Sequence, residues 1–188
     1  MKNFSPPDVS IIAAPGTLLP VTPTLRGLAE IFARQRMTDH AARRPSEDRG
    51  SPAANQQADF YGALAELGVL LEIEPLRVRM GLPCENGFLR KGKCDLLLGT
   101  RILEIKATPP GKNYCCINAE QHTEANTDTW YLPVLFNADG SGLRVMAPVS
   151  WAAVGRWDYR QDKHSPYYSV HVNTLKPLRS LESLCRAA

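Results

Sequence analysis

The sequence predicts an α/β protein in which helices flank a mixed central β-sheet. Three patterns support this prediction: apolar residues at helical spacing, then a β-hairpin, then a further helix with more strands after it. A length of 188 residues is enough for one domain with its own core. We expect residues 1–55 to form an N-terminal arm, a helix and a mobile linker, and residues 56–188 to form the α/β domain.

The N-terminal part combines a proline-rich arm with one helix. Residues 1–23 are rich in proline and small residues, which is typical of an extended arm on the surface. Thr24 is expected to cap a helix over residues 25–37. Residues 38–55 show no periodicity and predict a mobile loop.

A second helix is expected over residues 55–70, because its apolar residues recur at helical spacing and Gly68 lies near its end. Residues 72–80 are then predicted to form the first strand of the sheet. Pro75 within this segment suggests an edge strand or a bulge, since proline cannot donate a ladder hydrogen bond.

The clearest strand signal lies in residues 91–106. Three leucines, Leu96 to Leu98, run into Gly99-Thr100, and a second apolar run follows, as in a hairpin closed by a tight type II′ turn. Counting outward from the turn pairs Leu98 with Arg101, Leu97 with Ile102, Leu96 with Leu103 and Asp95 with Glu104. One face then carries Cys94, Leu96, Leu98, Leu103 and Ile105, and we expect it to face the core.

The opposite face of the hairpin concentrates charge. It carries Lys93, Asp95, Leu97, Ile102, Glu104 and Lys106. Carboxylates directly opposed on a sheet destabilise it, so either the lysines or a bound cation must compensate them. Hard divalent metals such as Mg²⁺ prefer carboxylate oxygens, which makes this face a candidate metal site.

Asp95, followed after eight residues by Glu104-Ile105-Lys106 at the end of an apolar strand, resembles the core of the PD-(D/E)XK nuclease superfamily. Restriction enzymes, junction resolvases and repair nucleases share this core. The matching residues are confined to the hairpin, and Cys94 stands where the family name has proline. The resemblance implies a restriction-endonuclease-like core. It also implies that Asp95, Glu104 and the Ile105 carbonyl bind Mg²⁺, for which Mn²⁺ can substitute, and that Lys106 positions or activates the attacking water.

The resemblance also points to two helices beside the hairpin. In the family, the helix before the sheet often supplies another acid to the metal site. Gln57 stands where many members carry Glu, which leaves Asp59 and Glu66 as the acidic candidates, and Glu66 lies one residue off the apolar stripe. Many members place Gln or Lys on the helix after the catalytic strand, and Gln121 is the corresponding candidate here.

The rest of the chain supplies further strands and short helices. The predicted elements are a helix over 118–126 capped by Asn118, strands over 129–136, 143–147 and 167–172, and helices over 151–157 and 180–186.

The charge of the chain permits a nucleic-acid partner without requiring one. A net charge of +3 and a pI near 8.6 are only mildly basic. Positive residues nevertheless gather around the hairpin, and the loop after Lys106 lies beside the candidate site. The candidate nucleic-acid contacts are Arg77, Arg79, Lys91, Lys93, Lys112 and Asn113.

Cysteine usage and hydropathy indicate the cellular compartment. The five cysteines show no spacing typical of a disulfide framework or a zinc site. No stretch is long and apolar enough for a membrane span, and the N-terminus lacks the apolar centre of a secretory signal. We therefore expect reduced thiols, a cytoplasmic protein and no membrane partner.

The sequence as a whole leads to one functional expectation and two alternatives. We expect a Mg²⁺-dependent endonuclease that hydrolyses phosphodiester bonds of nucleic acid, with DNA favoured over RNA. A homodimer is compatible with the resemblance, since many such nucleases cut both strands as dimers. One alternative is a catalytically inactive nuclease-fold module that binds nucleic acid or protein, which Gln57 favours. The other is a structural or interaction protein in which Asp95, Glu104 and Lys106 form a surface salt-bridge cluster.

Overall fold

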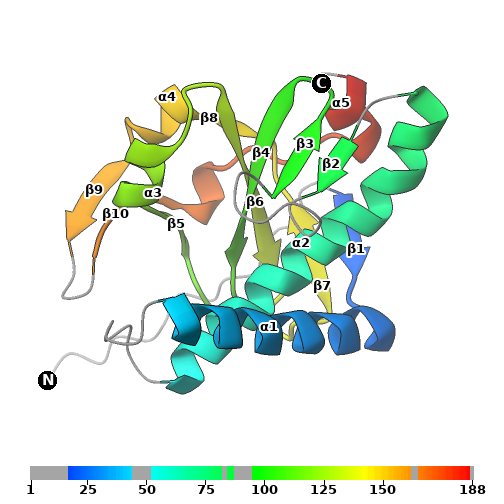
Figure 1. Ribbon diagram of the computed structural model, residues 1–188. Helices are drawn as coiled ribbons and strands as arrows, with labels where there is room; N and C mark the ends of the chain where they lie inside the picture. The colour runs from blue at the N-terminus through cyan, green and yellow to red at the C-terminus, as the bar shows by residue number, and fades with distance from the viewer. Residues whose placement is uncertain (1–16, 44–51, 82–83, 87–94, 162–164, 187–188) are drawn as a thin grey trace, which may run out of the picture.

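A computed structural model describes residues 17–43, 52–81, 84–86, 95–161 and 165–186 of the chain, and within these residues the protein is mixed α/β (Figure 1). The larger sheet has the strand order β1-β7-β6-β4-β3-β2. An additional strand, β8, also pairs with β6 and is not part of this linear order. Its strands are β1 (Thr17–Pro20), β2 (Cys84–Asn86), β3 (Leu96–Leu98), β4 (Arg101–Thr108), β6 (Thr129–Phe136), β7 (Gly142–Val145) and β8 (Val149–Ser150).

A smaller sheet and the helices complete the fold. The smaller sheet has the order β5-β10-β9 and consists of β5 (Tyr114–Asn118), β9 (Asp158–Gln161) and β10 (Pro166–His171). The helices are α1 (Pro23–Arg43), α2 (Pro52–Met80), α3 (Ala119–Glu124), α4 (Trp151–Val154), the short 3₁₀ helix η1 (Val172–Thr174) and α5 (Leu181–Arg186). Figure 1 shows α2 crossing one face of the larger sheet, and α1 crossing the N-terminal half of α2.

The larger sheet is mixed, as predicted. Strands β4 and β6 run parallel, from Ile102 opposite Thr129 to Thr108 opposite Leu135, while the other pairs are antiparallel. A parallel pair needs a crossover connection, and here β5 and α3 supply it. Figure 1 shows that the smaller sheet lies to one side of β4, together with α3 and α4.

The predicted hairpin register is confirmed for the three pairs that lie within β3 and β4. Leu98 pairs with Arg101, Leu97 with Ile102 and Leu96 with Leu103. Gly99 has φ of +60°, and no non-glycine residue in the described part of the chain has positive φ. Because Thr100 therefore has negative φ, the turn is type II′ rather than type I′.

The predicted strand over residues 72–80 is wrong, because α2 continues to Met80. Ile73 is fully buried, and Leu76 and Met80 pack against the same core, so the spacing of these three residues suits a helix face better than a strand. Pro75 lies inside the helix on its exposed side rather than at a sheet edge.

The N-terminus of α1 differs from the predicted cap. Helix α1 begins at Pro23, and the Thr22 hydroxyl accepts a hydrogen bond from the Leu25 amide at 3.1 Å. Thr22 is therefore the capping residue in place of Thr24, and Pro23 occupies the first helical position, where its missing N–H costs nothing.

Other predicted boundaries also shift. Helix α1 extends to Arg43 and α2 starts at Pro52, so both ends of the predicted loop over 38–55 are helical, and residues 44–51 lie outside the described residues. Part of the predicted arm is strand β1, which pairs with β7 and buries Leu19, while residues 1–16 are not described. Strand β6 matches its prediction, whereas α3 and α4 are shorter than predicted.

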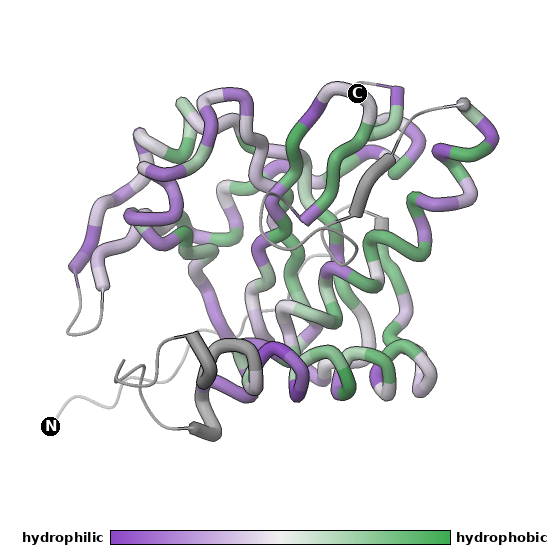
Figure 2. The backbone as a smooth tube through the Cα atoms, in the orientation of Figure 1, coloured by the Kyte–Doolittle hydropathy of each residue, from purple (hydrophilic) through white to green (hydrophobic). Residues whose placement is uncertain are grey.

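The core lies between α2 and the larger sheet, where Figure 2 shows hydrophobic residues concentrated. Leu64 and Ile73 from α2 meet Leu96, Leu98 and Leu103 of the hairpin. Helix α1 contributes buried residues to the same core. None of the helices in the described ranges has the length and hydrophobicity needed to cross a membrane.

Candidate active site

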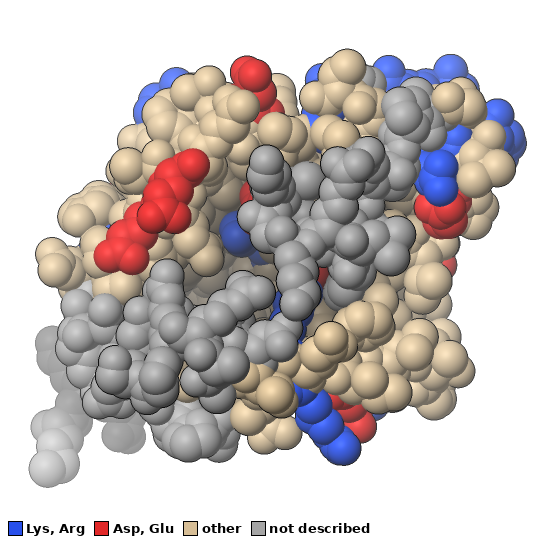
Figure 3. Space-filling view, in the orientation of Figure 1, with Lys and Arg blue, Asp and Glu red and all other residues tan. Residues whose placement is uncertain are grey.

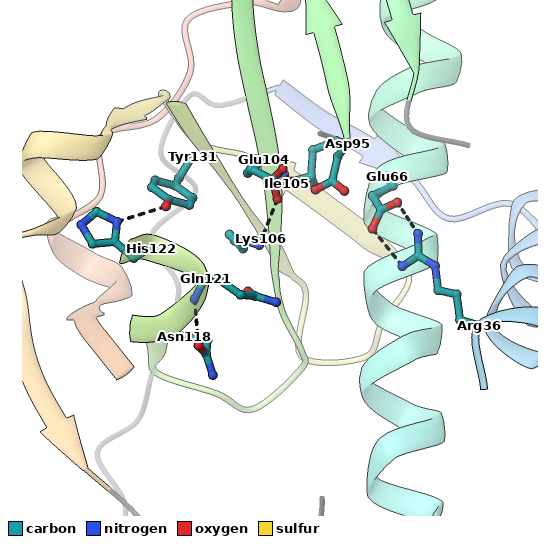
Figure 4. A network of polar contacts seen from close by, with 10 residues as sticks. All are labelled: Arg36, Glu66, Asp95, Glu104, Ile105, Lys106, Asn118, Gln121, His122 and Tyr131. Carbon is teal, nitrogen blue, oxygen red and sulfur yellow. Dashed lines mark hydrogen bonds and ion pairs between the residues drawn. The ribbon is translucent and has the colours of Figure 1, made fainter. Parts of the chain in front are cut away.

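Acidic side chains from different elements meet beside β4 (Figure 4). Glu66 comes from the middle of α2, Asp95 from the residue before β3, and Glu104 from β4. Leu103 and Ile105 are buried in the core, so strand alternation turns Glu104 and Lys106 to the opposite face. The predicted division of the hairpin into an apolar and a charged face is thereby confirmed for the described residues.

Two hydrogen bonds hold the hairpin residues of this cluster in place. The Ile105 amide donates a hydrogen bond to Asp95 Oδ2 at 2.7 Å, and Lys106 Nζ donates to Glu104 Oε2 at 3.3 Å. The side chains of Lys106 and Glu104 are only 19% and 24% exposed. This ion pair is therefore more buried than one on an ordinary solvated strand face.

Arg36 of α1 is a member of the cluster that the sequence did not single out. Its Nη1 donates to Glu66 Oε1 at 2.9 Å, and its Nη2 contacts Glu66 Oε2, so the two side chains form a bidentate pair. Glu66 is 8% exposed, although its position off the apolar stripe was compatible with solvation.

Counted over the described residues, the cluster holds more negative than positive charge when all its groups are ionised. Three carboxylates, Glu66, Asp95 and Glu104, face the two cations Arg36 and Lys106. Burial and the neighbouring Asp95 carboxylate raise the pKa of Glu66 to about 7, although Arg36 opposes the shift. Burial also raises the pKa of Asp95, against the effect of Lys106, and burial and Asp95 together raise the pKa of Glu104.

Helix α3 approaches the cluster from the other side. The Asn118 side chain accepts hydrogen bonds from the Glu120 and Gln121 amides at 2.9 and 3.1 Å, which confirms it as the helix cap. Gln121 is exposed, and Figure 4 shows its side chain extending from α3 toward the side of β4 that carries Lys106.

Tyr131 and His122 form a buried polar pair next to Glu104. His122 Nδ1 lies 3.0 Å from the Tyr131 hydroxyl, and its ring stacks on Trp151 with centroids 4.7 Å apart. Burial, with a contribution from the Glu104 carboxylate, raises the pKa of Tyr131 to about 12. Tyr131 is not among the predicted site residues, although its register position opposite Glu104 follows from the parallel pairing of β4 and β6.

The residues predicted to contact nucleic acid do not lie together at one place on the protein. Arg77 and Arg79 lie in the last turn of α2, and Arg77 pairs with Glu74. They stand about 16 Å or more beyond Glu66 along the helix axis, at 1.5 Å per residue. Lys112 and Asn113 are exposed in the loop after β4, as expected. Lys91 and Lys93 lie outside the described residues.

The remaining helix candidates differ in burial. Asp59 is half-buried and its charge acts on Arg36, whereas Gln57 is exposed. Of the candidates on α2, Glu66 is therefore the one whose carboxylate interacts with Asp95.

The donor set suits a hard metal ion in kind, but its side chains are not already arranged around one. Carboxylate oxygens are the ligands that Mg²⁺ prefers. Within the residues that the structure describes, no three His, Cys, Asp or Glu side chains form a group that is ready to hold a metal ion. Both carboxylate oxygens of Glu66 are engaged by Arg36.

Figure 3 shows a recess in this face of the molecule, with basic and acidic atoms visible in it.

The scan against protein families and the search of curated proteins both found no match to the chain.

Proposed function

We propose that this chain is a Mg²⁺-dependent nuclease of the PD-(D/E)XK type, with a restriction-endonuclease-like core, that cleaves phosphodiester bonds of nucleic acid and favours DNA over RNA. The observation that carries the proposal is the cluster itself. The carboxylates come from three places in the chain: Glu66 in α2, Asp95 just before β3, and Glu104 in β4. They meet beside the Lys106 ammonium in a partly buried position. A surface salt bridge needs no such convergence of distant elements.

The charge balance supports a divalent cation as cofactor. Among the described residues, three carboxylates against two cations leave one negative charge in excess. Burial raises the pKa of each carboxyl group, and the Asp95 carboxylate raises those of Glu66 and Glu104 further. Asp95, Glu104, Glu66 and the Ile105 main-chain carbonyl are the groups that would hold Mg²⁺, with Mn²⁺ as a substitute. When bound, such an ion acidifies water and stabilises charge on a phosphate.

The residues of the chain itself position the reacting groups. Glu104 Oε2 accepts a hydrogen bond from the Lys106 ammonium at 3.3 Å, which holds the lysine on the open face of β4. From there Lys106 orients the attacking water or contacts a phosphate oxygen. Gln121 extends from α3 toward the same face and supplies an amide for substrate or water. Tyr131 lies opposite Glu104 on the neighbouring strand, and its hydroxyl is hydrogen-bonded to His122.

A specific observation also favours the inactive binding module as a second candidate. The bidentate Arg36 pair occupies both oxygens of Glu66, so the third carboxylate is neutralised without any metal. A chain that has lost turnover would retain such a pair to stabilise the fold. Calorimetric titration with Mg²⁺ distinguishes the two candidates, because the nuclease binds the ion and the inactive module does not.

Cleavage of plasmid DNA and of an RNA of matched length, each with Mg²⁺ or with EDTA, tests the proposed function. We expect Mg²⁺-dependent cleavage that falls about 100-fold or more in Asp95→Asn and in Lys106→Met. Asp128→Asn and Lys176→Met are matched controls at residues outside the cluster and should cleave like the wild type. Circular dichroism and thermal unfolding show whether each variant is folded. Retained activity in both folded cluster variants would rule out the proposal.

A further inference from the structure

A groove of about 540 Å³ lies on the smaller sheet, next to the candidate active site. Small-ligand sites typically have volumes of about 300–1,000 Å³. Its lining includes Lys112, Tyr114, Cys116, Asn118, Arg160 and Tyr167. Ala107 also lines it and directly follows Lys106 on β4, so the groove begins where the catalytic strand ends.

Strand register explains why these residues share one surface. On β5, Tyr114, Cys116 and Asn118 alternate with the buried Cys115 and Ile117. Across the sheet, Asn118 pairs with Tyr167 of β10, and Tyr167 pairs with Arg160 of β9. The groove is therefore the outer face of this sheet, while the inner face packs into the protein.

The groove combines aromatic rings, cations and amides. The Arg160 guanidinium lies over the Tyr114 ring, 4.9 Å from its centroid, and Tyr114 is 42% exposed. Lys112 is exposed in the loop at the β4 side. Among the residues described on this face, Asp158 is the acidic one, and it lies 3.6 Å from Arg160, both well exposed to solvent.

We propose that this groove binds unpaired nucleotides of the nucleic-acid substrate next to the bond that is cut. Sheet surfaces that pair exposed aromatic rings with Arg or Lys bind single strands, because every base can stack while the cations contact phosphates. A stacked duplex presents its phosphates but not its base faces, so the Tyr114 ring has no base to stack on in a duplex. The substrate class is nucleic acid with a single-stranded segment. This inference rests on the proposed function for its place beside the cleavage site.

Binding is measured by fluorescence anisotropy with a labelled 12-nucleotide oligothymidine and with a blunt duplex, in EDTA so that no cleavage occurs. We expect Tyr114→Ala and Arg160→Ala each to weaken oligothymidine binding about tenfold, and we expect Tyr114→Ala to change duplex binding less than twofold. Lys112→Ala should lower the slope of log affinity against log salt by about 0.7. Arg156→Ala, an exposed arginine in the turn after α4, is the matched control and should bind like the wild type.

Cys116 gives a second readout that needs no variant. Its thiol is exposed and lines the groove, whereas Cys115 is buried. Oligothymidine should slow alkylation of Cys116 at least about threefold at saturation, as followed by peptide mass spectrometry, because a bound ligand occludes the site. Affinity that is unchanged in both groove variants, undiminished alkylation, or no binding of oligothymidine would each overturn the inference. If oligothymidine binds in the groove but Mg²⁺-dependent cleavage is absent, the inference about the groove stands and only the nuclease proposal is refuted.

Discussion

Arg36 on α1 holds both carboxylate oxygens of Glu66 on α2. Thirty positions separate the two residues along the chain, and their contact joins the N-terminal helix to the candidate active site. Because Glu66 also interacts with Asp95, a metal ion bound at the cluster as proposed would compete with the arginine for this carboxylate.

Arg36→Met is expected to change metal response and stability in opposite directions. Without metal at pH 8, loss of the partly buried ion pair should lower the free energy of unfolding by about 2 kcal/mol. The stabilisation by Mg²⁺, measured as the shift in Tm, should increase because Glu66 is released. Arg34→Met alters an exposed arginine on the same helix and serves as control. A Mg²⁺ shift equal to that of the wild type would show that Arg36 and metal do not compete.

Stability without metal should fall as the pH rises through the window set by Glu66. The pKa of Glu66 is about 7 in the folded protein and near 4.5 in the unfolded chain, so the folded state holds the extra proton between these values. The free energy of unfolding therefore declines with rising pH in this window, by up to about 1.4 kcal/mol per pH unit for one such group. Asp95 and Glu104 act in the same direction, since their pKa values are also raised.

Urea unfolding between pH 5 and 8 in EDTA measures this slope. Glu66→Gln should flatten it, whatever its effect on absolute stability. Glu74→Gln is the control, because Arg77 lowers the pKa of that exposed carboxyl and its titration falls below the window. With Mg²⁺ present the slope should reverse in the wild type, since metal binds the deprotonated carboxylates. An unchanged slope in Glu66→Gln would contradict the assignment.

Two helical glycines should respond oppositely to alanine. A Cβ at Gly68 would meet Leu143 Cδ2 at 2.8 Å, in the core between α2 and β7, whereas a Cβ at Gly27 would meet nothing within 4 Å. Alanine favours helix by about 1 kcal/mol, but overpacking a core costs about 1–3 kcal/mol. Chemical denaturation should show Gly27→Ala stabilised by up to about 1 kcal/mol and Gly68→Ala destabilised. Equal effects would mean that α2 can move away from the sheet.

Pro75→Ala should stabilise the protein. Proline inside a helix lacks the N–H that would bond to the preceding turn, and it costs about 3 kcal/mol relative to alanine. Pro75 is on the exposed side of α2, so its replacement removes no core contact. We expect the free energy of unfolding to rise by about 1–3 kcal/mol. Val78→Ala, at another exposed position of the helix, should change it by less than about 0.5 kcal/mol.

The sequence predicted those parts of the fold that local rules determine. The hairpin register follows from Gly99 and the alternation of leucines around it, and the cap of α3 follows from Asn118. Pro75 misled the prediction for α2, because packing of Ile73 and Leu76 on the core outweighs the local cost of a proline.

Non-local contacts account for what the sequence missed. Strand β9 is exposed along its whole length and carries polar residues, so its only strand signal is its pairing with β10. The candidate site shows the same contrast. The hairpin alone is enough to place Asp95, Glu104 and Lys106 together. The burial of Glu66 depends on Arg36, which lies on a different helix, and no periodicity records that contact.

Strand β1 determines how one margin of the larger sheet meets other molecules. It is four residues long, it is the terminal strand beyond β7, and it ends in Pro20. An unpaired strand margin is a template for intermolecular β-pairing, and brevity and proline both oppose it. Deletion of residues 1–20 would expose the outer backbone of β7, whose inward residues Leu143 and Val145 are apolar, and would promote aggregation. Strand β1 thus protects colloidal stability without contributing a residue to the acidic cluster.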